Sequence, residues 1–387
     1  MSTTRSRFAD DSPDARAALQ LALTPDVGPL LRSRLLADWG DAASVLAASE
    51  TQLQQTLGIG PKIARRIVES AKWVDLDAVL AEVRAAGLCV LLPESEDYPP
   101  LLREIPDPPG VLFVRGQLLP TDRLAVAVVG TRRASRYGLE QAERLAAALA
   151  RAGVTVVSGL ARGIDGAAHR GALAAGGRTV AVLGSGVLNI YPPEHASLAD
   201  EVAQQGAIVS EALPHGAPLA GAFPQRNRII SGMTMGTLVI EAADRSGALI
   251  TARLAMEQGR EVFALPGRVD SATSSGPHRL LRDGAKLTVH VDDILEELHA
   301  LAHVALGRAV HSDLRRENSI AEQTLTDEQR CVYAAIGDDS RIDDVAQTCG
   351  LPIQRVLAAV TALESRRLVA KCSGSRVGRR RDALEVS

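Results

Sequence analysis

Short apolar runs rich in β-branched residues alternate with helix-length segments between residues 124 and 291, and three of the runs end directly before a glycine. Parallel strands are joined by long crossovers, usually helices, so this alternation predicts βαβ units and a parallel sheet covered on both faces. The predicted strands are Leu124–Val129, Val154–Ser158, Thr179–Leu183, Ala207–Val209, Thr237–Glu241 and Glu261–Leu265. The predicted fold class is therefore α/β.

The three glycines, Gly130, Gly159 and Gly184, mark the edge of the sheet where a binding site is expected. The carboxyl ends of neighbouring parallel strands lie at one edge of an open sheet, and ligands bind in the crevice outside that edge. Functional residues are therefore expected in the turns that follow these glycines.

The turn after the first predicted strand is rich in arginine. Its residues are Gly130, Thr131, Arg132, Arg133, Ala134, Ser135, Arg136, Tyr137 and Gly138. It has neither the GxGxxG pattern of dinucleotide sites nor the lysine of a phosphate-binding loop. Guanidinium groups at the start of a helix favour an anion, and the Tyr137 ring offers a face on which a base can stack. The alternative is that these arginines are solvated side chains of a surface loop.

The second turn places Ser158, Gly159 and Arg162 at the same edge, and Asp165 and His169 follow. We interpret Asp165 as a helix N-cap rather than a catalytic acid. His169 is interpreted as a structural residue rather than a base.

The third turn contains Gly184 and Gly186 and begins like a dinucleotide fingerprint, but Asn189 stands where the last glycine belongs. It continues into Tyr191 and two prolines. This turn adds an aromatic ring to the edge of the sheet.

A further segment combines an aromatic ring with two arginines around an amide, at Phe223, Arg226, Asn227 and Arg228. The chain has four Phe, four Tyr and two Trp, so the concentration of rings in these few turns is informative. Rings and guanidinium groups along one cleft suit single-stranded nucleic acid, because bases stack on the rings and phosphates pair with the cations. The alternative is that each ring closes a small apolar cluster under its own loop.

Taken in order, these segments resemble one known family. They are GTR at 130–132, SGLARGID at 158–165, GSG at 184–186, FPQRNRIISG at 223–232, GTLVIEA at 236–242, SGALITA at 246–252 and DGAKL at 283–287. The set resembles the DNA-processing protein A (DprA, also Smf) family. The resemblance implies an extended Rossmann-like domain that binds single-stranded DNA. It also implies a cytoplasmic homodimer without enzymatic activity, cofactor or metal, which loads the RecA recombinase onto DNA coated with single-strand-binding protein during natural transformation.

The resemblance further implies roles for single residues. Arg132 is the principal phosphate ligand, and Arg162, Arg226, Asn227 and Arg228 help to form the DNA-facing edge. The predicted DNA-binding residues are Gly130, Thr131, Arg132, Arg133, Arg136, Ser158, Gly159, Arg162, Gly184, Gly186, Phe223, Arg226, Asn227 and Arg228.

One loop departs from the pattern of the family. Many members carry lysine or arginine just after the Tyr-Pro pair, whereas this chain has Pro193 and Glu194. No DNA contact is therefore assigned to that loop.

Helical segments flank the α/β region on both sides. Before it, the turn Val27-Gly28-Pro29 recurs as Ile59-Gly60-Pro61, which resembles a helix-hairpin-helix whose helix starts hold a phosphate. A helical packing module without DNA contact is the open alternative. After the α/β region, Thr326–Ile336, Ile342–Cys349 and Pro352–Arg366 resemble the helices of a winged helix-turn-helix. The last of these helices is poor in positive charge, which favours a protein-contact or regulatory role.

The predicted organisation has five parts. They are an N-terminal helix-hairpin-helix (SAM-like) domain at 15–78, an extended Rossmann-like domain at 79–300, a linker at 301–323, a winged-helix domain at 324–375 and a basic tail at 376–387. The run Arg379-Arg380-Arg381 in that tail is predicted to add a non-specific phosphate contact.

Charge, cysteine spacing and the lack of long apolar runs limit the kinds of binding site and the cellular location that this chain is expected to have. The 43 Lys and Arg against 46 Asp and Glu leave a net charge of −3, so any DNA-binding charge must be concentrated in patches. The four cysteines lie far apart without metal-ligand spacing, which predicts neither a zinc site nor a disulfide framework. The polar start and the lack of long apolar runs predict a cytoplasmic protein without a membrane span.

Two other functions remain as alternatives. Gly236-Thr237 followed by Glu241 resembles the phosphate and ribose site of nucleotide phosphoribohydrolases, but the spacing to the glutamate is one residue too long. A transcription factor that senses a nucleotide would need a basic recognition helix, which the last helical segment lacks.

Overall fold

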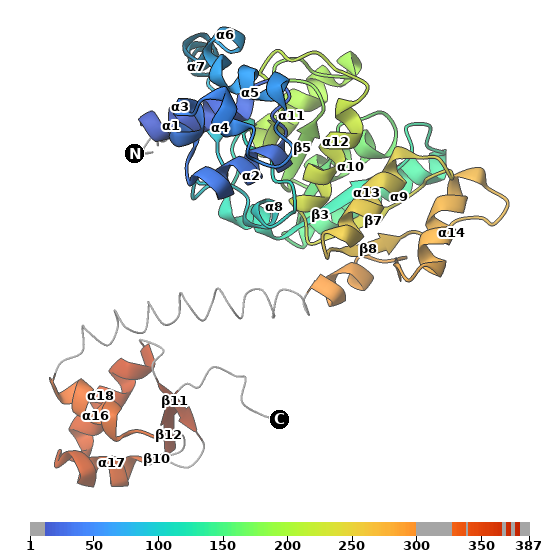
Figure 1. Ribbon diagram of the computed structural model, residues 1–387. Helices are drawn as coiled ribbons and strands as arrows, with labels where there is room; N and C mark the ends of the chain where they lie inside the picture. Colours follow the sequence, from blue (N-terminus) through green and yellow to red (C-terminus); the bar gives the residue numbers. More distant parts are fainter. Residues whose placement is uncertain (1–11, 299–326, 338–339, 366–368, 373–375, 380–387) are drawn as a thin grey trace. The chain divides into compact units, whose positions relative to one another are not determined.

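The six predicted strands are six neighbouring strands of one sheet in the computed structural model, with ends that differ from the prediction by two residues at most. They are β3 (Ala125–Val129), β4 (Thr155–Ser158), β5 (Thr179–Leu183), β6 (Ala207–Ser210), β7 (Gly236–Val239) and β8 (Glu261–Ala264). All five residues of β3 are buried, as expected for a central parallel strand. The structure describes residues 12–298, 327–337, 340–365, 369–372 and 376–379. The described residues up to Leu298 form one compact unit, and those from Asp327 onward form a second (Figure 1).

The sheet of the first unit has nine strands among the described residues, in the order β1-β2-β6-β5-β4-β3-β7-β8-β9. The strands from β3 to β9 are mutually parallel, whereas β1 (Cys89–Leu91) and β2 (Leu112–Gly116) extend the sheet in antiparallel fashion beside β6. The short edge strand β9 (Lys286–Leu287) pairs with β8. Strand β3 lies between β4 and β7, where the strand order reverses, and such a reversal opens a crevice at the carboxyl edge.

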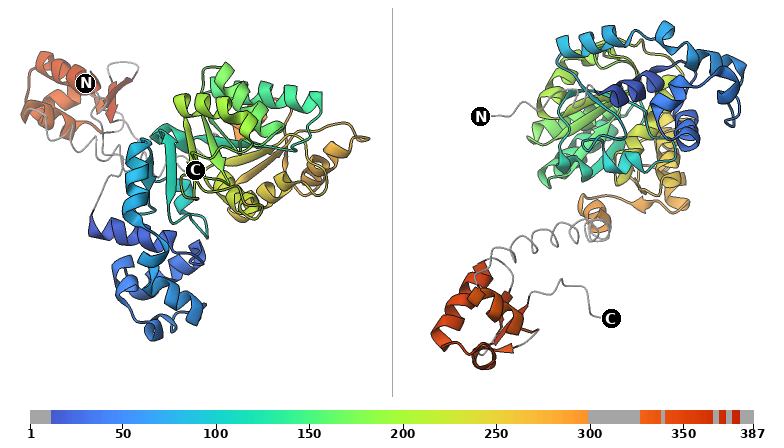
Figure 2. Two further views of the ribbon diagram at one scale, coloured as in Figure 1. Left: turned by 90° about the horizontal axis from the view of Figure 1, so that it is seen from above. Right: turned by 60° about the vertical axis from the view of Figure 1, so that its left-hand side comes forward.

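Helices cover both faces of this sheet (Figures 1 and 2). The helices that pack on the sheet or follow its strands are α7 (Leu76–Ala85), α8 (Pro100–Arg103), α9 (Arg136–Arg151), α10 (Ile164–Ala174), α11 (Ala196–Gln205), α12 (Ala222–Gly232), α13 (Gly247–Glu257) and α14 (Ser275–Arg282). The 3₁₀ turns are η1 (Pro120–Arg123), η2 (Pro193–His195) and η3 (Ala272–Ser274). Alternate residues of β3 face opposite sides of the sheet: Ala127 belongs to the same apolar cluster as Ile229 of α12, and Val128 belongs to the cluster of Leu145 of α9.

The N-terminal helices have their own apolar core, which contains Leu21, Leu35, Leu53 and Ile67. These helices are α1 (Pro13–Leu23), α2 (Pro29–Trp39), α3 (Ala42–Ala47), α4 (Glu50–Leu53), α5 (Pro61–Val68) and α6 (Ser70–Trp73). Helices α2 and α5 begin at the prolines of the repeated Gly-Pro turn, with the glycines as N-caps. The repeat therefore marks two helix starts.

The predicted boundary between residues 78 and 79 falls inside α7 and is not a break in the structure. Leu80 and Val83 of α7 pack in one cluster with Leu19 of α1 and Phe113 of β2. The helical segment and the sheet are thus joined by continuous apolar packing. Sequence reasoning missed this because α7 shows the same helical periodicity as the helices before it.

The second unit contains the three helices expected from the sequence, α16 (Asp327–Ala335), α17 (Ile342–Cys349) and α18 (Ile353–Ser365). They share a core with a small sheet in the order β10 (Ser340–Arg341), β12 (Arg376–Arg379) and β11 (Val369–Cys372). Strand β12 lies where the sequence predicted the start of the basic tail. Its only apolar side chain, the buried Val377, gives a weak strand signal. The predicted linker at 301–323 and the residues Arg380 and Arg381 lie outside the described residues.

His169 of α10 is fully buried, as its structural interpretation requires. Its Nδ1 lies 2.7 Å from the Thr179 hydroxyl, which itself donates to the Val156 carbonyl, so Nδ1 carries the hydrogen and Nε2 is the bare nitrogen. Nε2 has no hydrogen-bond partner among the described residues. Burial therefore lowers the pKa of His169 from 6.5 to about 3.

This burial predicts an acid-dependent loss of stability. Between about pH 6.5 and pH 3 the unfolded chain binds a proton at His169 that the folded chain does not, so stability falls as the pH falls. The slope from this group is about 1.4 kcal/mol per pH unit within that window. Denaturant unfolding at several pH values measures it, and the His169→Asn variant is expected to show a slope smaller by one proton. An identical slope in the variant would contradict the assignment.

Candidate nucleic-acid interface

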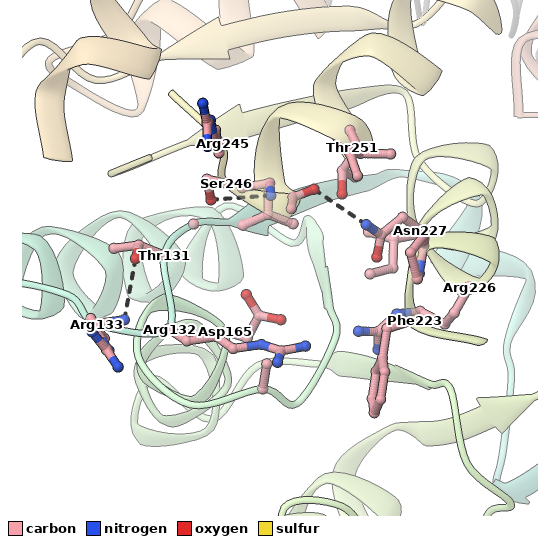
Figure 3. Close-up of a pocket in the computed structure, with 18 of the residues that line it drawn as sticks. Thr131, Arg132, Arg133, Asp165, Phe223, Arg226, Asn227, Arg245, Ser246 and Thr251 are labelled. Carbon is pink, nitrogen blue, oxygen red and sulfur yellow. Dashed lines mark hydrogen bonds between the residues drawn. The ribbon is translucent and has the colours of Figure 1, made fainter. Parts of the chain in front are cut away.

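A cleft of about 850 Å³ opens at the carboxyl edge of the sheet, where the strand order reverses. Its walls come from the turns after β3, β4, β5 and β7 and from the first half of α12 (Figure 3). Residues from these five segments include Arg132, Asp165, Tyr191, Ser246 and Phe223, in that order. The position of the cleft is the one that the three strand-terminal glycines predict.

Glu241, at the carboxyl end of β7, holds the turn that carries the arginines. Its backbone carbonyl accepts a hydrogen bond from Thr131 N at 2.7 Å. Its carboxylate accepts from Ser135 N at 2.8 Å and from Ser135 Oγ at 2.6 Å, and Thr273 Oγ1 donates to the same group at 3.1 Å. Ser135 in turn caps α9 by accepting from Gly138 N at 3.0 Å. The carboxylate of Glu241 is thus buried and used internally, which does not favour the phosphoribohydrolase alternative.

Arg132 extends from this turn across the cleft toward Phe223 (Figure 3). Its guanidinium carbon lies 5.3 Å from the centre of the Phe223 ring, within the range of a cation–π contact. The Phe223 ring lies 5.6 Å from the Tyr191 ring, at a tilt of 50°. Arg132 is exposed, and its charge acts on the buried carboxyl of Asp165 in the same cleft without forming an ion pair with a carboxylate in the described part of the chain. A free guanidinium beside two rings is a site for a phosphate and a neighbouring base.

Arg226 lines the cleft, at the edge where the sequence predicts it, but most of its side chain is buried (Figure 3). It is 6% exposed, and its Nη1 donates to the Gly159 carbonyl at 2.7 Å and to the Val182 carbonyl. Burial lowers its pKa to about 10, so it remains charged at neutral pH, and Asp165 is its nearby counter-charge. In this structure, the two hydrogen bonds of Arg226 join the loop after β4 to the end of β5.

Asp165 is not an N-cap, because α10 begins after Gly163 and Asp165 lies within the first helical turn. Its Oδ2 accepts a hydrogen bond from Gly159 N at 3.2 Å. Gly159 is therefore held at its N–H by Asp165 and at its carbonyl by Arg226. A Cβ atom at Gly159 would lie 2.6 Å from both side chains, which explains the glycine. Burial raises the pKa of Asp165, and the charge of Arg226 opposes this shift.

Arg228 is also buried, at 6% exposure, and lies outside the lining of the cleft. Its Nε donates to Asp107 at 3.0 Å, and its Nη2 donates to Glu211 at 2.8 Å. The sequence treats Arg226 and Arg228 as neighbours on one surface. Two residues apart on a helix, however, the side chains point about 200° away from each other. Arg226 and Arg228 of α12 therefore contact different parts of the protein: Arg226 bonds to the loop after β4, and Arg228 bonds to Asp107 and Glu211.

Other predicted residues are placed by the structure as follows. Thr131, Arg133, Asn227 and Gly130 line the cleft, and Asn227 Nδ2 donates to the Gly247 carbonyl at 3.3 Å. Ser158 is fully buried and donates to the Val128 carbonyl, and Gly186 lies so close to Pro214 that a side chain would not fit. Gly184 lies against the Phe223 ring but does not line the cleft. Arg136 pairs with Glu140, and Tyr137 contacts the Pro266 carbonyl, so both lie beyond the cleft lining.

Arg162 is exposed, but it is paired within the protein. Its Nε donates to the carboxylate of Glu194 in η2. The loop to which sequence reasoning assigned no DNA contact thus contacts one of the predicted DNA ligands.

Sequence reasoning missed three polar residues of the cleft, of which Thr251 lies on α13. Arg245 and Ser246 follow β7 and stand at the rim opposite Arg132 (Figure 3). The rule that selects the turns after β3, β4 and β5 would also have selected the turn after β7. Its lack of a strand-terminal glycine explains the omission.

The basic residues of the second Gly-Pro turn are paired as well. Lys62 and Arg66 both contact Asp26, and Arg65 contacts Glu50. The side chains of Lys62 and Arg65 are exposed, so these surface pairs leave both the phosphate-binding and the packing interpretations open.

No helix in the part that the structure describes has the length and apolar character of a membrane span. No group of three metal-ligating side chains occurs within the same part.

Comparison with known proteins places the chain in a family. The sequence profile of DNA recombination-mediator protein A matches residues 89–299, and that of the DprA winged helix domain matches residues 318–375. The chain is 43% identical over 334 residues to Protein Smf of Escherichia coli strain K12, which covers 85% of this chain and 87% of that protein. Its fold is similar to the X-ray structure of DNA processing protein A from Streptococcus pneumoniae, with a TM-score of 0.64 and 35% identity over 73% of this chain and 97% of that one. A structure described for the single-stranded DNA binding mode of DNA processing protein A from Helicobacter pylori has a TM-score of 0.50 and 31% identity over 55% of this chain and 96% of that one. The matching profiles, the identity to Protein Smf and the similar fold show that the chain belongs to the DNA recombination-mediator protein A (DprA/Smf) family.

Proposed function

We propose that this chain is a single-stranded DNA-binding protein that uses the carboxyl-edge cleft and has Arg132 as its principal phosphate ligand. The observation that carries the proposal is the free guanidinium of Arg132 over the Phe223 ring, with the Tyr191 ring beside it. These groups pair with phosphates and stack on bases, but they offer little to read the hydrogen-bonding edges of a base. Binding is therefore expected to be nearly independent of sequence and steeply dependent on salt.

Family membership supports a more specific role. The Helicobacter pylori relative is described by its single-stranded DNA binding mode, and several relatives are called DNA processing proteins. We infer that the chain acts in the cytoplasm as a homodimer and loads RecA onto incoming single strands during natural transformation. It does so as a binding protein without catalytic residues or a cofactor. A dimer would hold one strand at two clefts, which raises the effective concentration of the second contact.

A binding titration tests the first part of the proposal. Labelled single-stranded and double-stranded oligonucleotides of the same sequence are titrated with the protein at several salt concentrations. We expect tighter binding to the single strand and a linear fall of log K with log salt. Equal affinity for both forms, or affinity that salt does not change, would contradict the proposed cleft.

The loading role needs a second measurement. RecA filament formation is followed on DNA coated with single-strand-binding protein, with and without this chain. A shorter lag in the presence of the protein is the expected result. An unchanged lag, while the DNA is demonstrably bound, would refute the RecA role and leave the DNA-binding proposal in place.

A further inference from the structure

The ion pair between Arg162 and Glu194 lies beside the proposed phosphate site. Arg162 and Arg132 both line one small pocket, together with Tyr191 and Phe223. The side chains of Arg162 and Glu194 are 53% and 48% exposed, so solvent and ligands reach both. A strand bound at Arg132 would therefore pass next to a second guanidinium that already holds a carboxylate.

The backbone keeps Glu194 in this position. The neighbouring His195 contacts the Leu160 carbonyl through Nδ1 at 2.9 Å, and its own N–H donates to the Pro192 carbonyl at 3.0 Å. The His195 ring also fits over Gly166, where a Cβ atom would lie 2.8 Å from the ring. The turn η2 is thus docked on the loop that carries Arg162. An ordinary surface ion pair is held only by its own two side chains and contributes little to stability, whereas here the backbone holds the carboxylate next to Arg162.

Arg162 and Glu194 also stabilise each other's charged form. The hydrogen bond from Arg162 lowers the pKa of Glu194, and the same contact raises the pKa of Arg162, so both groups are charged at neutral pH. A carboxylate and a phosphate present oxygens to a guanidinium in the same way. Glu194 therefore occupies the Nε donor of Arg162, one of the donors that a phosphate would use.

We propose that Glu194 is an internal competitor for DNA phosphate at Arg162, which must give up its hydrogen bond to Nε before the strand can use the whole guanidinium group. This inference rests on the proposed function, because it needs a strand in the cleft. It deepens that function by naming a residue that sets the affinity and salt dependence of binding.

The Glu194→Gln variant tests the competitor directly. Anisotropy of a labelled dT homopolymer is measured against protein concentration over a range of salt. An exposed ion pair of this kind corresponds to binding that is about two- to fivefold tighter when the carboxylate is removed. One additional phosphate contact makes the slope of log K against log salt more negative by about 0.7.

Two further variants separate competition from a general charge effect. Glu143→Gln is the matched control, because Glu143 pairs with Arg170 at nearly the same exposure, 46% and 48%, and lies outside the cleft lining. We expect no gain from it. In the Arg162→Gln/Glu194→Gln double variant, the gain seen with Glu194→Gln alone is expected to disappear.

Three results would overturn the inference while the wild-type protein binds DNA. They are an unchanged affinity and slope for Glu194→Gln, an equal gain for Glu143→Gln, and a gain that persists in the double variant. A wild-type protein that binds no dT homopolymer would instead contradict the proposed function, and the inference with it.

Discussion

Replacing Arg132 with glutamate is expected to weaken binding of single-stranded DNA by about 10- to 100-fold, because a hydrogen-bonded charge contact is worth about 1.5–3 kcal/mol. The guanidinium is the free cation over the Phe223 ring, and glutamate replaces it with a charge that repels phosphate. Loss of the phosphate contact also makes the slope of log K against log salt shallower by about 0.7. Anisotropy titrations at several salt concentrations measure both quantities.

Arg151→Glu is the matched control for this change. Arg151 is exposed in the last turn of α9, the helix that follows the Arg132 turn, and it lies about 20 Å along the helix from the cleft. The same reversal of charge at that end is expected to leave affinity within about twofold. If both variants lose affinity equally, net charge rather than the cleft determines binding. Unfolding midpoints close to wild type are expected for Arg132→Glu, since its side chain is exposed.

Replacing Arg226 with glutamine is expected to act on folding instead, and to lower the free energy of unfolding by about 3–5 kcal/mol. The change removes the larger of the two positive charges that act on the buried Asp165, leaving that of Arg132, and it leaves the carbonyls of Gly159 and Val182 without their hydrogen bonds from Arg226. Denaturant unfolding followed by tryptophan fluorescence measures the effect on the first unit alone, because Trp39 and Trp73 both belong to it.

A double variant tells a buried charge pair from a general packing defect. Arg226→Gln/Asp165→Asn removes both charges, so it is expected to be more stable than Arg226→Gln alone. If the second change adds a further loss of stability, the interaction between the two charges is not what stabilises the loops.

Much of the sheet could be predicted from the sequence, for a physical reason. A parallel strand buried on both faces must be apolar along its whole length, and residues 125–129 show this directly. Strands β1, β2 and β9 were not predicted. Strands β1 and β9 are short edge strands, and β2 lies next to β1, so all three fall outside the alternation of parallel strands and helices.

The site could be located from the sequence, but the use of each arginine could not. The rule for carboxyl edges placed Arg132 and Phe223 at one cleft, and the structure brings them within 5.3 Å. Whether an arginine is free depends on carboxylates that are distant in the sequence. Asp107 pairs with Arg228 across 121 positions, and no local pattern announces such a partner. DNA contact by the residues of the cleft stays a prediction.

The central position of β3 has a consequence for the order of events during synthesis of the chain. Val126 of β3 pairs with Val156 of β4 on one side, and with Gly236 of β7, far later in the sequence, on the other. The half of the sheet from β3 to β6 can therefore form on the ribosome before β7 has been made, since domains fold progressively from the N-terminal end. Glu241, which anchors the Arg132 turn, follows β7 and arrives only with that late segment. We expect a nascent chain that stops before β7 to hold much of the fold without an ordered arginine turn, so that competence to bind arises at the end of folding rather than at its start.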